Sequence, residues 1–96
     1  MTSKMILALL ALAPVTLAVN SQIAKAGEFA AMDCQELWVA RNQIYKDNGY
    51  CFTSARAITY FGNGGCSYHS TGALPVSNYD RTLLRRIKES ERGHHC

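Results

Sequence analysis

The apolar residues after position 30 recur at helical spacing, and the first such pattern spans residues 33–47. Apolar and aromatic side chains stand three and four positions apart along it, which predicts one buried stripe on a helix. Asp33 and Glu36 have the spacing of a capping box, so we expect the helix to begin there. Gly49 is expected to end it, because glycine takes the left-handed conformation at a helix C-terminus without strain. The stripe comprises Leu37, Trp38, Arg41, Ile44 and Tyr45.

Two further helices are predicted downstream. A short one covers residues 54–61, with Thr53 as its expected cap. The last one follows the cap Ser77, has Asp80 in its first turn near the positive end of the helix dipole, and stops at Gly93. Its predicted apolar face carries Tyr79, Leu83, Leu84 and Ile87. Nowhere do β-branched residues alternate over a useful length, so we predict an all-α fold, a small three-helix domain.

The apolar faces of these helices and the aromatic segment between them are expected to form one core. Its predicted members are Leu37, Trp38, Ile44, Tyr45, Phe52, Ile58, Phe61, Leu83, Leu84 and Ile87. Arg41 lies on the apolar stripe, where an arginine requires a carboxylate or several carbonyls as partners. Asn42 is expected to satisfy backbone groups of a loop. Both residues are interpreted as structural clamps, with the floor of a small pocket as the alternative.

The N-terminal segment has the pattern of a secretory signal peptide. A short start with Lys4 precedes the apolar run "MILALLALAPVTLAV", and "AKA" at residues 24–26 is a small-x-small cleavage pattern. We expect residues 1–26 to be removed after Ala26, or alternatively after Ala18, which leaves a periplasmic or secreted domain of residues 27–96. A membrane anchor is the competing interpretation, but the run is short for about 30 Å of hydrocarbon and contains a proline.

The net charge of the protein falls once this segment is removed. The formal charge of +3 includes Lys4 and Lys25, and residues 27–96 carry eight basic against seven acidic side chains. A nearly neutral domain exerts little steering on polyanions, so we expect no nucleic-acid partner. The last helix carries a basic cluster, interrupted by Glu89 and Glu91, that is interpreted as a solvated face rather than a contact to an anionic envelope surface. The cluster comprises Arg81, Arg85, Arg86, Lys88 and Arg92.

All four cysteines lie in the expected mature part, and an even number in a short exported chain predicts two disulfides. If the first and last helices are antiparallel, Cys34 and Cys96 meet. Cys51 and Cys66 flank the short second helix and are within reach of one another. A bond from Cys34 to Cys51 would have to span the first helix, ~20 Å at 1.5 Å per residue. We therefore favour Cys34–Cys96 with Cys51–Cys66, while Cys34–Cys66 with Cys51–Cys96 stays open.

Candidate chemistry is sparse. The adjacent residues His94, His95 and Cys96 suggest a metal site, which His69 would have to complete, but consecutive side chains point in different directions and rarely close a tetrahedron. Oxidised cysteines supply neither a thiolate ligand nor a nucleophile. Neither a nucleophile elbow nor a phosphate-binding glycine loop is present. We expect no catalytic residue, no metal and no cofactor.

One stretch resembles a known family. The segment "LWVARNQIYKDNGYCF", residues 37–52, is similar to the motif of the YARHG domain, a small extracytoplasmic bacterial module. The matching residues are Leu37, Trp38, Arg41, Asn42, Ile44, Tyr45, Gly49, Tyr50 and Phe52. Lys46, Asp47 and Asn48 stand where the family has Ala-Arg-His, so no role of those residues carries over. The resemblance implies the fold and an extracytoplasmic location, and it brings no catalytic residues.

The sequence thus predicts an exported, non-catalytic module, stapled by two disulfides, that binds an envelope or extracellular partner and keeps no stable membrane anchor after cleavage. A small periplasmic enzyme is the alternative, either a hydrolase that uses a pocket at Arg41 or a thiol oxidoreductase. A metal-binding protein that uses His94 and His95 is a third possibility.

Overall fold

The structure is a computed structural model that describes residues 28–96. The expected signal peptide, residues 1–26, lies outside the described residues. A 3-10 turn, η2 (Phe29–Ala31), belongs to a separate unit that ends at Ala31. The second unit, residues 32–96, contains α3 (Cys34–Asp47), α4 (Ala55–Phe61), η3 (Thr71–Ala73) and α5 (Asn78–Gly93).

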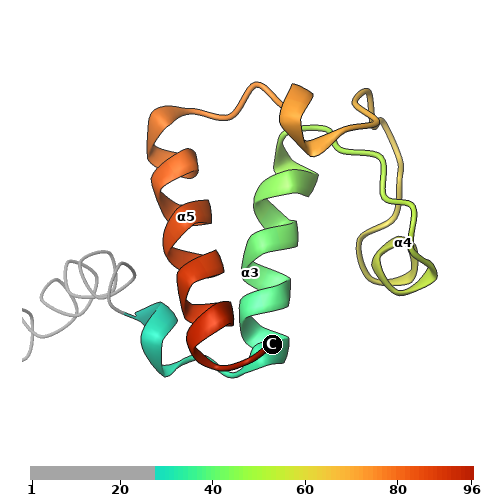
Figure 1. The fold of residues 1–96 in the computed structure, drawn as a ribbon. Coiled ribbons are helices and arrows are strands. Elements are labelled where there is room, and N and C mark those ends of the chain that lie inside the picture. Colours follow the sequence, from blue (N-terminus) through green and yellow to red (C-terminus); the bar gives the residue numbers. More distant parts are fainter. Residues whose placement is uncertain (1–27) are drawn as a thin grey trace, which may run out of the picture. The chain divides into compact units, whose positions relative to one another are not determined.

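The two long helices, α3 and α5, run antiparallel side by side, and the short α4 lies on the other side of α3 (Figure 1). Their caps are local. The Asp33 carboxylate accepts a hydrogen bond from the Glu36 amide at 2.8 Å, and the Glu36 carboxylate accepts one from the Asp33 amide at 3.1 Å. Ser77 accepts from the Asp80 amide at the start of α5. Within residues 28–96 there are three α-helices and no strand, so the predicted all-α class is confirmed.

The start of α4 differs from the prediction. The hydroxyl of Ser54, not of Thr53, accepts the hydrogen bond from the Ala57 amide at 3.2 Å. A capping side chain must reach the amide of the second or third helical residue. Because α4 begins at Ala55, Ser54 is the residue placed to do so. At the other end of the fold, Gly93 is the last residue of α5 rather than its stop.

The core gathers around Tyr45, on the side of α3 that α4 and the loops cover. Its buried members are Tyr45, Phe52, Ala57, Leu74 and Leu84, with Trp38, Ile44, Tyr50, Phe61, Tyr68 and Val76 packed against them. Leu37 and Ile87 are fully inaccessible, and Leu83 is also buried, although none of the three belongs to this cluster. Most of the predicted core residues are therefore buried or half-buried, but they do not form a single cluster.

Two expectations about the apolar faces are wrong. Ile58 is 42% exposed and Tyr79 is 65% exposed. A helix of two turns has too few positions to define its buried face, and α4 turns Ala57 inward instead. At the start of α5, the loop residues Leu74 and Val76 pack in and against the core, whereas Tyr79 faces solvent.

The chain between α3 and α4 is held by the chain that follows α4. Gly49 has φ +89°, the left-handed conformation expected of it, and an added Cβ there would lie 3.3 Å from the Tyr68 ring. The Cys51 amide donates to the Tyr68 carbonyl at 2.8 Å. The Asn63 side chain accepts from the Phe52 amide at 2.7 Å and donates to the Phe52 carbonyl at 2.9 Å. These two hydrogen bonds from one side-chain amide hold the backbone at Phe52, as the hydrogen bonds of a neighbouring strand would in a sheet.

Candidate functional site

Arg41 and Glu91 join the middle of α3 to the end of α5. The Arg41 guanidinium donates to both Glu91 carboxylate oxygens, at 2.8 and 3.1 Å. Burial works to lower the pKa of Arg41, but the hydrogen bonds and charge of Glu91, together with the Tyr45 hydroxyl, outweigh it and raise the pKa above its usual value. Arg41 therefore acts as an interhelical clamp, and the carboxylate that the sequence required is Glu91.

Asn42 was expected to bond backbone groups of a loop, but it does not. Its side-chain amide donates to the Trp38 carbonyl at 2.9 Å, one turn earlier in the same helix. The residue is 6% exposed, so this bond satisfies a buried polar group within α3. The side chain of Asn42 therefore stabilises α3 itself.

The aromatic residues of the motif form a ladder that leads from α3 to α4. Tyr45 contacts Tyr50, Tyr50 contacts Phe52, and Phe52 stacks on Phe61, with ring centroids 5.1–5.9 Å apart. Trp38 continues the ladder against Phe61 at 5.6 Å, and the Arg56 guanidinium lies 3.7 Å from the centroid of the Trp38 ring. Such pairs add roughly 0.5–1.5 kcal/mol each beyond the area they bury. The family motif is therefore mainly a packing motif.

All four cysteines are paired in the structure, Cys34 with Cys96 and Cys51 with Cys66. This is the arrangement that antiparallel packing of the first and last helices favours. Cys34 and Cys96 lie on the exposed surface, whereas Cys51 is buried. Closing a loop with a sequence separation of 62 residues is worth about 4 kcal/mol and one of 15 residues about 3 kcal/mol in chain-entropy estimates.

The histidines are not brought together into a metal site. Within residues 28–96 no three side chains of the histidine, cysteine, aspartate and glutamate types are grouped so that they could hold a metal ion. His94 and His95 follow α5 directly, and Cys96 beside them is committed to its disulfide. None of the helices in the described part of the chain is long and apolar enough to cross a bilayer.

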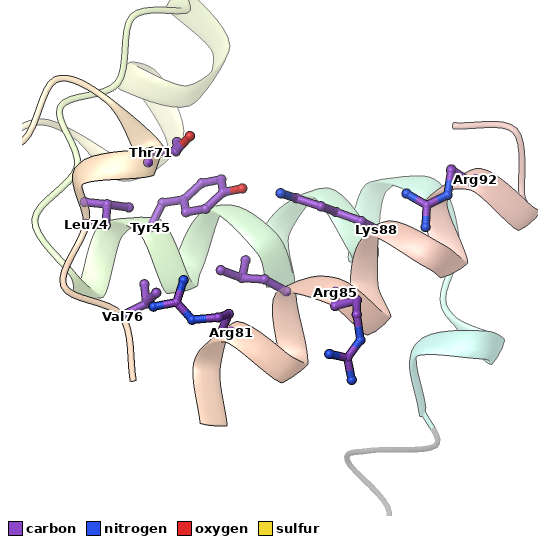
Figure 2. A pocket seen from close by; sticks show the side chains of 10 residues that line it. Tyr45, Thr71, Leu74, Val76, Arg81, Arg85, Lys88 and Arg92 are labelled. Atoms are coloured by element: carbon purple, nitrogen blue, oxygen red, sulfur yellow. The ribbon is translucent and has the colours of Figure 1, made fainter. Parts of the chain in front are cut away.

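A concave surface lies between α5 and the η3 loop, which we call the α5 groove (Figure 2). Its volume is about 380 Å³, and it is open to solvent. Its basic lining residues are Arg81, Arg85, Lys88 and Arg92, and its other lining residues are Tyr45, Thr71, Gly72, Leu74, Val76 and Leu84. No acidic residue of the described chain lines it. The basic residues had been interpreted as a solvated face, because nothing in the sequence indicates that the η3 loop folds beside them and adds an apolar floor.

Comparison with known proteins identifies the class. The family model of the YARHG domain matches residues 14–92, so the chain belongs to the YARHG domain family, as the resemblance implied. No curated protein and no solved structure matches the chain. The family is an extracytoplasmic one, and two disulfides are typical of a protein that folds in an oxidising compartment. The family carries no assigned activity.

Proposed function

We propose that the protein is an exported, non-catalytic binding module of the bacterial envelope, which acts in the periplasm or outside the cell after loss of residues 1–26. The apolar N-terminal run and "AKA" at residues 24–26 support export. Membership of an extracytoplasmic family and the paired cysteines agree with it.

The polar groups on which the two enzyme alternatives depend already hold the fold together. Arg41 is bound by Glu91, Asn42 by its own helix, and the cysteines by one another. The hydrolase and oxidoreductase alternatives both depended on these groups. Arg41 does line a concave surface of about 400 Å³ with Glu91 and His95, but Glu91 binds its guanidinium there. Nothing in the described residues favours the oxidoreductase or the metal-binding tail.

The α5 groove is the observation that carries the proposal. It combines concavity, positive charge and an apolar floor, which is the usual composition of a site that binds a small charged group. Its apolar floor is ordered by the core, because Tyr45, Leu74 and Leu84 belong to both. A floor held in this way loses little conformational entropy when a ligand binds.

A sedimentation assay tests the proposal. The full chain is expressed in bacteria, and the exported, oxidised protein is mixed with isolated envelope fractions, with a reduced and alkylated sample as the control for fold dependence. We expect the oxidised protein to sediment with one fraction and the alkylated sample to stay in the supernatant. Retention of the protein in the cytoplasm, or equal sedimentation of both samples, would overturn the proposal.

A further inference from the structure

We propose that the α5 groove is a binding site for a phosphate-bearing ligand. The phosphate would lie among the basic side chains of α5, and an apolar or ring-shaped part of the same ligand would lie on Tyr45, Leu74 and Leu84. This inference rests on the proposed function and names the chemistry of the ligand.

The charge of the groove supports an anion. In residues 28–96 the recorded ion pairs join Arg41 to Glu91 and Arg85 to Glu89, and Arg81, Lys88 and Arg92 take part in neither. The Arg85–Glu89 pair is 3.9 Å long, with both side chains more than half exposed, and such pairs contribute little. Among the described residues, the groove itself is therefore lined by basic and no acidic side chains, and Glu91, which lines the adjoining concavity with Lys88 and Arg92, is already paired with Arg41.

The spacing of the basic residues concentrates this charge on one face. Arg81, Arg85, Lys88 and Arg92 follow one another at intervals of four, three and four residues, which places them on one side of a helix. From the first to the last they span ~16 Å at 1.5 Å per residue. In Figure 2 the Lys88 side chain and the Tyr45 hydroxyl point toward one another across the middle of the groove, whereas the Arg85 guanidinium points away. The centre of the site is therefore Lys88, with Arg81 and Arg92 on either side.

Charge balance favours phosphate over a single carboxylate. A phosphate monoester carries about −1.5 to −2 at neutral pH and offers three acceptor oxygens, whereas a carboxylate carries one charge. Arginine forks match phosphate oxygens in bidentate geometry, and lysine adds a point charge. Basic side chains that line the same groove repel one another, and a multiply charged group relieves this repulsion more fully than a singly charged one.

The shape of the site favours a protruding group over a flat surface. The basic residues form one wall of a concavity whose opposite wall includes Thr71 and Gly72 of the η3 loop. A planar charged surface would meet the rims of such a groove and leave its apolar floor uncovered. A phosphorylated sugar can contact both walls, and so can the phosphate headgroup of a lipid. Both sources share the same phosphate chemistry.

The test uses the exported protein and variants of three kinds. Lys88→Gln/Arg92→Gln removes charge from the site. Gly72→Leu narrows the groove without changing charge, and it is compatible with the fold because a Cβ there meets only Ser70 Oγ at 3.7 Å. Arg86→Gln is the matched control, because Arg86 is an exposed residue of the same helix that does not line the groove. Circular dichroism of each variant establishes that it is folded.

Calorimetric titration with a phosphorylated hexose, and co-sedimentation with phosphatidic acid vesicles against phosphatidylcholine vesicles, distinguish the two sources. We expect binding of at least one phosphate probe. The double variant should weaken it about tenfold or more, because each charge-assisted hydrogen bond contributes on the order of tenfold in affinity. Gly72→Leu should weaken it as well, and Arg86→Gln should leave it within about twofold, since its charge acts only at long range. Binding of the phosphorylated hexose indicates a soluble ligand, and binding only to the phosphatidic acid vesicles indicates a lipid headgroup.

Three results would overturn the inference: no binding of either probe, an equal loss in Arg86→Gln and the double variant, or full binding by Gly72→Leu. The last two would show diffuse attraction without a site. The double variant could also sediment with envelope as efficiently as the unmodified protein. That result would leave the proposed envelope binding intact and show that the α5 groove is not its site. Phosphate binding without any envelope association would support the phosphate site and overturn the proposed envelope binding.

Discussion

The Arg41–Glu91 pair offers the sharpest test of how α3 and α5 are held together. The two side chains are 26% and 16% exposed and make two hydrogen bonds, so the pair is intermediate between an exposed and a fully buried salt bridge. At an effective dielectric of about 20, two charges at this range attract by ~4 kcal/mol, and desolvation and side-chain ordering offset much of that. We therefore expect a coupling free energy of about 1–2 kcal/mol.

A double-mutant cycle measures this coupling directly. Arg41→Ala, Glu91→Ala and the double variant are unfolded with urea while both disulfides stay intact. The Arg85–Glu89 pair on the exposed face of α5 is the matched control, for which we expect no more than about 0.5 kcal/mol. In a domain of this size each kcal/mol lost lowers the melting temperature by about 4–8 °C. A coupling for Arg41–Glu91 that is no larger than for the control would refute the clamp.

Three further predictions follow from burial and export. Leu37→Ala should destabilise the domain by about 2–5 kcal/mol in urea unfolding because the side chain is fully inaccessible, whereas Ile58→Ala should change little; equal losses would contradict the core described above. Limiting reductant followed by alkylation and peptide mapping should label Cys34 and Cys96 before the other pair because they are exposed, and labelling in the reverse order would count against this. N-terminal sequencing of the exported protein should begin after Ala26, and recovery of the original N-terminus from an extracytoplasmic fraction would exclude cleavage.

Local patterns made the helices predictable. Capping depends on residues three positions apart, so Asp33 with Glu36, and Ser77 with Asp80, are visible in the sequence itself. Gly49 is equally local, because its backbone conformation follows from the helix it ends. The requirement of Arg41 for a carboxylate was predictable from its place on an apolar stripe, but the choice of Glu91 depends on how two helices are aligned.

The Ser54 cap and the bond from Asn42 to Trp38 are local features that the sequence prediction missed, but the other missed features depend on chain segments that are distant in sequence. Asn63 holds Phe52 across eleven positions, and nothing in its own neighbourhood indicates this. The groove arises because the η3 loop places Thr71 and Gly72 opposite the basic face of α5. The charged residues were identified from their spacing, but only the concavity separates a binding site from a solvated face.

Nuclear magnetic resonance of the isotopically labelled, exported protein tests the central claim most directly. A detergent extract of bacterial envelope is titrated into the oxidised protein, and backbone amide shifts are followed. A binding module that acts through the α5 groove should show saturable shifts at Thr71, Gly72 and the Lys88–Arg92 turn, reduced in the Lys88→Gln/Arg92→Gln variant. An extract that leaves these amides unmoved, or that shifts only the face around Trp38 and Tyr60, would contradict the account.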